Sequence, residues 1–409
     1  MLQDAAHRPR WEVCDVFRRF GASYLAERGL PSSHLRVMHH IQTCRTAVLG
    51  GHMEACDSCD HERPVYNSCR DRHCPKCGTM TKEKWLAARK AELLPVDYFH
   101  KVFTLPHELN ALTLGNKRVV LTVLFHAVAE TLLQFGRDQR SRLGGKTGFT
   151  LVLHTWNQQL LDHFHIHCVI PAGVLSADGK TWTPAKSGRF LFSVKALSVV
   201  FRAKFLAHLQ RAYDGGDLVF PGALSADAEP RAFADLLARL GGKQWVVYSK
   251  APFGGPERVL EYLGRYTHRV AISNHRLVHV TDKDVTFSYR DRADGSKTKT
   301  ATVSGHEFIR RFLLHVLPKG FTRIRHYGLL ASRKKVENLA ACRAALGAEA
   351  SPPTKQPSDP AERLLALTGI DVLKCPNCAQ GRMHRRSTLS APWDISLAQS
   401  IAISCANSS

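Results

Sequence analysis

Histidine alternates with apolar residues three times in succession over residues 163–168. In a β-strand, successive side chains point to opposite faces, so His163, His165 and His167 would share one face. The apolar residues between them would share the other face, which can pack on a hydrophobic core. A single histidine on a strand is usually structural, but two imidazoles at i and i+2 can coordinate one metal ion. The segment therefore predicts a strand with a metal-binding face and a buried face.

The charge balance indicates a polyanionic partner. The chain of 409 residues carries 57 Lys and Arg against 35 Asp and Glu, a formal net charge of +22. Nucleic acid is the commonest large polyanion inside cells, so we expect the protein to bind DNA. Residues 1–19 lack the apolar core of a signal peptide, and the longest apolar segment, 119–133, is too short for a membrane span. We expect a cytoplasmic protein with a buried helix there and no membrane partner.

The cysteines predict a zinc site. Twelve cysteines in a chain without an export signal are more typical of metal binding than of disulfides. Cys56-x2-Cys59 and Cys74-x2-Cys77 are separated by fourteen residues, and two such knuckles can complete a tetrahedral shell. We therefore predict a structural zinc ion on Cys56, Cys59, Cys74 and Cys77, with no open position for catalysis.

The sequence does not decide the roles of other residues near these two Cys-x2-Cys motifs. Cys69 and His73 could exchange into the zinc site, join a second site with His52 or His61, or take no part. Cations around the knuckles could contact DNA phosphates or form a solvated face. They are Arg63, Arg70, Arg72, Lys76, Lys82 and Lys84.

Hydrophobic periodicity predicts an α+β fold. Residues 98–105 and 149–155 have strand character and precede the histidine strand. Only a turn separates 149–155 from the histidine strand, so these two strands are expected to be antiparallel neighbours. Gln158 lies in that turn and could reach the histidine face. Helices are expected over residues 11–30, 33–43, 80–94, 111–135, 194–213, 230–240 and 308–316.

Two tyrosines are spaced for one face of a helix. Tyr262 and Tyr266 stand four residues apart, although apolar neighbours at helical spacing fit an ordinary core stripe equally well. Gly264, with Arg265 and Arg269 nearby, favours close approach by an anion. A phenol has a pKa near ~10 and is a weak nucleophile until a nearby cation stabilises the phenolate. A metal on the histidine strand could supply that cation and orient a phosphate, so that tyrosine attack would give a phosphotyrosine.

Four segments, 66–77, 154–158, 163–168 and 262–272, together resemble the rolling-circle insertion-sequence transposases of the IS91 family. The resemblance implies a histidine-hydrophobe-histidine (HUH) endonuclease with two tyrosines, built on a central antiparallel sheet flanked by helices and acting on single-stranded DNA at element ends. It implies that His165 and His167 bind Mg²⁺ or Mn²⁺ and that both tyrosines are nucleophiles. Gln158 is the first choice for the third metal ligand, and His163 is the second.

The resemblance also implies a division of the chain. We expect a helical, zinc-binding domain over residues 1–95, the nuclease domain over 96–345, and a linker with a poorly ordered tail over 346–409. Cys375-x2-Cys378 lies in this tail as a lone knuckle, so a complete second zinc site is not predicted. A plasmid replication initiator or relaxase with the same chemistry, and a non-enzymatic zinc-containing DNA-binding regulator, are the alternatives.

Overall fold

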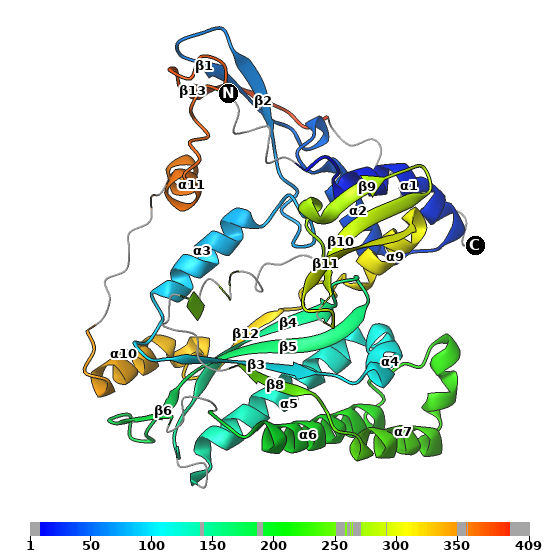
Figure 1. The fold of residues 1–409 in the computed structure, drawn as a ribbon, viewed down its shortest axis with the longest axis vertical. Coiled ribbons are helices and arrows are strands. Elements are labelled where there is room, and N and C mark those ends of the chain that lie inside the picture. Colours follow the sequence, from blue (N-terminus) through cyan, green and yellow to red (C-terminus); the bar gives the residue numbers. More distant parts are fainter. Residues whose placement is uncertain are drawn as a thin grey trace.

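The computed structural model describes residues 9–139, 143–185, 191–250, 258, 259, 262, 264, 271–291, 293–349, 357 and 359–392 (Figure 1). Its centre is a five-stranded sheet of order β12-β4-β5-β3-β8, in which every neighbouring pair is antiparallel. The strands are β3 (Tyr98–Thr104), β4 (Gly148–Trp156), β5 (Asp162–Pro171), β8 (Val247–Lys250) and β12 (Ile324–Gly328). The predicted α+β class with an antiparallel core sheet is confirmed, and the histidine strand β5 is the central strand.

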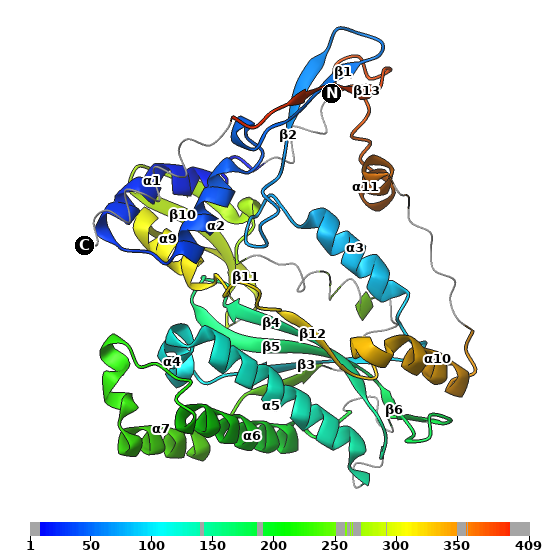
Figure 2. The same cartoon turned by 180° about the vertical axis from the view of Figure 1, so that it is seen from behind.

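Helices cover one side of this sheet (Figure 2). They are α4 (Asn110–Gly115), α5 (Lys117–Arg137), α6 (Val194–Asp214) and α7 (Pro230–Gly242). The apolar residues of β5 face these helices in one large core, as the alternation predicted. Within the described residues, α5 alone has the length and apolar content of a membrane span, and most of it is buried inside the protein. A small hairpin of β6 (Gly173–Leu175) and β7 (Trp182–Pro184) extends beyond the sheet.

The N-terminal helices share a second core with a distant part of the chain. α1 (Val13–Glu27) and α2 (Ser32–Thr43) pack on the antiparallel sheet β9-β10-β11 and on α9. Phe17 and Phe312 meet edge to face at 5.3 Å, and a Cβ on Gly305 would lie 2.3 Å from the ring of Phe20. α1 and α2 are therefore fixed against residues 277–314. The bounds are β9 (Leu277–Val280), β10 (Asp284–Asp291), β11 (Lys297–Ser304) and α9 (Gly305–Leu314).

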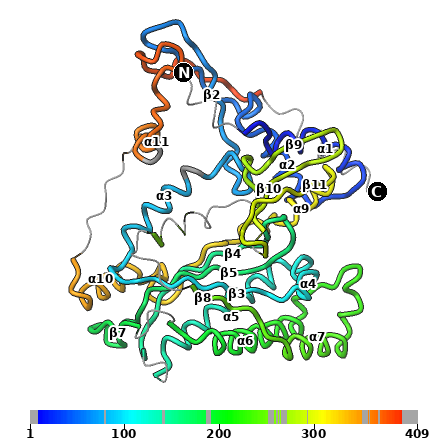
Figure 3. Tube along the Cα trace, in the orientation of Figure 1, coloured from blue at the N-terminus to red at the C-terminus, as the bar shows by residue number. Residues whose placement is uncertain are grey.

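The C-terminal part of the chain returns to the N-terminal part (Figure 3). After α10 (Lys335–Ala345) and α11 (Pro360–Thr368), β13 (Met383–Leu389) pairs antiparallel with β1 (Gly51–Cys56). The hairpin partner of β1 is β2 (Glu62–Tyr66), so the sheet has the order β13-β1-β2. The expectation of a poorly ordered tail within residues 346–409 is therefore wrong for β13, because β1 supplies it with a hydrogen-bonding edge.

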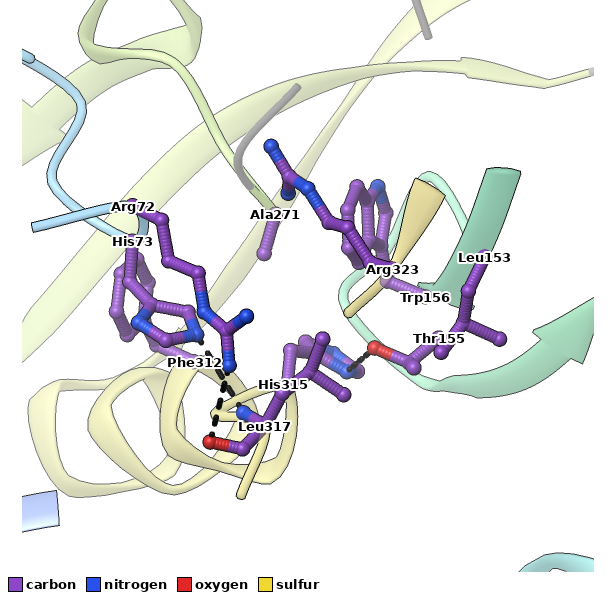
Figure 4. Close-up of a pocket in the computed structure, with 10 residues that line it drawn as sticks. All are labelled: Arg72, His73, Leu153, Thr155, Trp156, Ala271, Phe312, His315, Leu317 and Arg323. Atoms are coloured by element: carbon purple, nitrogen blue, oxygen red, sulfur yellow. Dashed lines mark hydrogen bonds between the residues drawn. The ribbon is translucent and has the colours of Figure 1, made fainter. Parts of the chain in front are cut away.

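Arg72 and His73 join the loop before α3 (Thr79–Lys90) to the segment between α9 and β12 (Figure 4). The Arg72 guanidinium donates to the carbonyls of Phe321 at 2.6 Å, Pro318 at 3.1 Å and Leu317 at 3.4 Å. The Leu317 N–H donates to His73 Nε2 at 3.4 Å. Arg72 was predicted to bind DNA, but its donors are directed at protein carbonyls. Its role in this structure is to hold the loop before α3 against the segment between α9 and β12.

We predict that Arg72→Ala lowers the free energy of unfolding by about 2 kcal/mol, because carbonyls that accept from a charged donor lose that donor. Urea denaturation followed by circular dichroism measures the change. Arg70→Ala is the matched control, since the Arg70 side chain is exposed. Its change should stay within about 0.5 kcal/mol. Equal losses in the two variants would contradict the role given to Arg72.

Candidate active site and zinc centres

Three histidines converge on the face of the central sheet opposite the large core. His165 and His167 lie on β5, and His154 on β4 is the direct antiparallel partner of His165. Ring nitrogens of the three lie within 4.8 Å of one another, and each side chain is at most 8% exposed. The predicted pair is therefore completed by a histidine that the sequence analysis did not select.

The two residues predicted as the third ligand are not among the three converging histidines. Gln158 is in the turn between β4 and β5, where its backbone carbonyl accepts a hydrogen bond from Arg276. His163 is exposed, and its carbonyl accepts from Nδ1 of His165 at 2.8 Å. His163 does not belong to the converging histidine group. Strand register decides this difference, because the antiparallel pairing places position 154 directly beside position 165.

The geometry of the three histidines fits a divalent cation. Because a carbonyl oxygen only accepts, His165 must carry its proton on Nδ1, which leaves the lone pair of Nε2 for a metal. That Nε2 lies 3.1 Å from Nε2 of His167. Neutral imidazoles whose lone pairs face a common point are a ligand set for divalent metals. The close approach of these buried histidine nitrogens is favourable when a cation binds between them.

His100 on β3 contacts Nδ1 of His167, whereas Nε2 of His167 lies against His165. Its Nε2 lies 2.9 Å from Nδ1 of His167, the two rings stack at 5.1 Å, and His100 is 2% exposed. A hydrogen bond to the second nitrogen of a metal-binding histidine fixes its orientation and tautomer. The sequence analysis missed His100, because one histidine in a short strand gives no spacing signal.

Tyr262 reaches the histidine group through His100. Its hydroxyl lies 3.3 Å from Nδ1 of His100, and the two rings meet edge to face at 4.7 Å. A residue nearly a hundred positions downstream of β5 is thus two hydrogen bonds from a histidine of the cluster. The other predicted residues of this segment, Tyr266, Arg265 and Arg269, lie outside the described residues.

The cysteines form two clusters of four rather than one. Cys74 and Cys77 lie with Cys44 and Cys69, and we call this group the first cysteine cluster. Sγ of Cys77 lies 3.5 Å from Cys44 and 3.6 Å from Cys69. Cys69, a possible additional ligand in the sequence, is thus a full member. His73 instead pairs with Asp71 at 2.9 Å and is not in the cluster.

Cys56 and Cys59 lie with Cys375 and Cys378 in the second cysteine cluster. The prediction that Cys56, Cys59, Cys74 and Cys77 share one ion is wrong, and the knuckle at Cys375 is not alone. The hairpin β1-β2 carries its cysteines away from the first cluster, and β13 holds the C-terminal knuckle beside them. Spacing alone could not show which knuckles pair, because pairing depends on contacts between distant segments.

Both clusters fit zinc. Four thiolates at a Zn–S distance of about 2.3 Å in a tetrahedron stand about 3.8 Å apart. The sulfur distances of 3.7 Å between Cys56 and Cys378 and 3.8 Å between Cys59 and Cys375 match this value. The Gly381 N–H donates to Sγ of Cys378 at 3.3 Å and lowers the pKa of that thiol to about 6, which favours the thiolate that zinc requires.

Two family models and two relatives match this chain. A putative transposase family matches residues 148–337, and a transposase zinc-binding domain matches residues 16–105. The putative transposase y4qJ of Sinorhizobium fredii is 51% identical over 375 residues, covering 91% of this chain and 94% of the relative. The transposase for insertion sequence element IS801 of Pseudomonas savastanoi pv. phaseolicola is 29% identical over 319 residues, covering 76% and 74%.

One solved structure was also compared. The metal-free conjugative relaxase TrwC in complex with OriT DNA is 14% identical, with a TM-score of 0.22 and coverage of 62% of this chain and 73% of that chain.

We predict two zinc ions per chain, measured by plasma mass spectrometry on purified protein. Cys375→Ser should reduce the content to one, because a site with three thiolates and a hydroxyl binds zinc more weakly than four thiolates do. Cys342→Ser is the matched control, since Cys342 is buried but belongs to neither cluster. A content of one ion in both variants and in the unsubstituted protein would contradict the second cluster.

Proposed function

This chain belongs to the IS91-type insertion-sequence transposases with a zinc-binding domain, and on that premise we propose that it cleaves and rejoins single-stranded DNA at element ends through tyrosine nucleophiles. The observation that carries the proposal is the contact of Tyr262 with His100 beside the histidine cluster. A phenol hydroxyl held within two hydrogen bonds of a divalent metal site is suited to attack on a phosphodiester bound at that site.

His154, His165 and His167 would hold the divalent cation, Mg²⁺ or Mn²⁺. When bound, such a cation orients the scissile phosphate and neutralises charge that develops on its oxygens. The chain holds these histidines on two rigid neighbouring strands, so that the site is formed before DNA arrives. Neither Gln158 nor His163 is needed as a ligand in this arrangement.

The hydrogen bonds around His100 favour a nucleophilic tyrosine. If His167 faces the cation with Nε2, its proton lies on Nδ1 and is donated to Nε2 of His100. A neutral His100 then carries its own proton on Nδ1 and donates it toward the hydroxyl oxygen of Tyr262. A hydrogen bond donated to that oxygen favours the phenolate, which is the attacking form.

In-line attack by Tyr262 would form the bond between its oxygen and phosphorus and break the bond from phosphorus to the 3′ oxygen. One proton leaves the Tyr262 hydroxyl and one is taken up by the 3′ oxygen, so the products are a 5′-phosphotyrosine and a DNA strand with a 3′ hydroxyl. Tyr266 is proposed as the second nucleophile, for a second cleavage or a return transfer. Arg70, Arg265 and Arg269 are proposed to contact DNA phosphates, in keeping with the net charge of +22.

We predict a covalent adduct between the protein and single-stranded DNA from an element end. Purified protein is incubated with end-labelled oligonucleotide and Mg²⁺ or Mn²⁺, and a denaturing gel reveals a labelled band at the mass of the protein. Chelation of the metal should abolish the band, and Tyr262→Phe with Tyr266→Phe should remove it as well. An adduct that persists in the double variant would exclude these tyrosines as nucleophiles.

We further predict that His154→Ala lowers the rate of adduct formation by at least about 100-fold, since even residues behind a metal ligand contribute 10–100-fold. Gln158→Ala is the matched control and should keep the rate, because the bond from Arg276 ends on the backbone carbonyl of residue 158. DNA binding, measured by filter retention, should persist in both variants, because phosphate contacts are spread over many cations. A larger loss in Gln158→Ala would restore Gln158 as the third ligand.

A further inference from the structure

The described residues of the tyrosine segment, Arg258, Val259, Tyr262 and Gly264, are helical and rest on two surfaces. One surface is the sheet, where Val259 is 1% exposed and packs with Tyr98 of β3 and Val169 of β5. The same small cluster includes Trp85 of α3. The segment that carries Tyr262 is therefore held between the sheet and α3.

The contact with α3 is so close that a side chain at position 264 would force either the ends of Leu86 and Lys82 or the tyrosine segment to shift. A Cβ on Gly264 would lie 2.8 Å and 3.2 Å from the two terminal methyl carbons of Leu86 and 3.3 Å from Cε of Lys82. Lys82, Trp85 and Leu86 are spaced i, i+3 and i+4, so they form one face of α3. We call this face the α3 seat. Gly264, which lies between the two tyrosines in the sequence, thus allows α3 of the same chain to approach closely.

Both ends of α3 are anchored. Cys77 of the first cysteine cluster lies two residues before its first residue, and Gly78 between them has a φ of 95° that turns the chain into the helix. At the other end, Arg89 contacts Nε2 of His326 on β12 at 3.1 Å. Arg89 also donates to Glu92 at 2.6 Å, and Glu92 accepts from Lys335 of α10 at 2.5 Å. The direction of α3 is set by the first cluster at one end and by the core sheet at the other.

From these contacts we infer that the α3 seat positions Tyr262 on His100, and that the zinc ion of the first cysteine cluster acts on the reaction through α3. The inference rests on the proposed function. The first cysteine cluster shares no residue with the histidine group, so Leu86 and this cluster are positioning elements and not catalytic residues. A displacement of about 1 Å of a reacting group can cost on the order of 100-fold in rate, so small changes of the seat are measurable.

A double-mutant cycle across the Leu86–Gly264 contact tests the seat. Gly264→Ala should slow adduct formation about tenfold or more, because its methyl group displaces the tyrosine segment. Leu86→Ala removes the atoms that this methyl group meets, and Leu86→Ala with Gly264→Ala should recover the rate of Leu86→Ala alone. A double variant as slow as Gly264→Ala would overturn the seat, since the alanine would then act through the backbone and not through Leu86.

Hydrogen exchange of the peptide that contains Tyr262, measured by mass spectrometry, gives a readout independent of activity. Gly264→Ala should speed exchange in this peptide several-fold while β3 and β5 stay protected, and the double variant should restore protection. Restored protection without any adduct from the unsubstituted protein would refute the proposed function and support the seat. Unchanged exchange in Gly264→Ala would overturn the seat, whatever the adduct assay shows.

The contribution of zinc is tested by Cys77→Ser in the full chain. We expect faster exchange in the peptide that contains Tyr262, whereas Cys375→Ser in the second cluster should leave that peptide unchanged. Equal effects of the two variants would overturn the link to the first cluster. If Cys77→Ser speeds exchange in β3 and β5 as much as in the peptide that contains Tyr262, the effect is general unfolding and the link to the first cluster is overturned.

Discussion

The antiparallel pairing of β4 with β5 is the constraint on which the candidate site depends. The pairing sets His154 directly opposite His165 and brings their nitrogens together with that of His167. Because side chains alternate with a period of two, a shift of one residue would turn His154 into the core. The buried apolar residues on the opposite face of β5 oppose such a shift, so the hydrophobic core of the sheet also fixes the geometry of the candidate metal site.

Around this pairing, the chain brings together residues from four distant segments. β3 supplies His100, which orients His167, and the tyrosine segment supplies Tyr262 to His100. α3 then bounds the tyrosine segment at Gly264, and the first cysteine cluster sets where α3 begins. A zinc site that is chemically closed can in this way matter to a reaction that takes place on another part of the molecule, through rigid packing alone.

The two cysteine clusters have different structural consequences. The first contains only residues of the N-terminal part and lies at the start of α3. The second joins Cys56 and Cys59 to a knuckle more than three hundred residues later, and β13 adds a strand to the same hairpin. A metal that closes a long loop limits the unfolded chain more than one that closes a short loop. The second site therefore fastens the C-terminal part, where the sequence predicted poor order.

Local patterns determined the secondary structure and the chemistry. The alternation of histidine and apolar residues predicted the histidine strand with its buried face, and the repeated Cys-x2-Cys motifs predicted zinc. The order of the motifs indicated the transposase family, which the relatives confirm. Pairing between distant segments was decided only by the tertiary structure. His154 instead of Gln158, His100, Cys44 and the partners of Cys375 all depend on strand register or on contacts across the chain. Spacing along a sequence reports which residues are neighbours in one element, but the burial of the cores selects which elements meet.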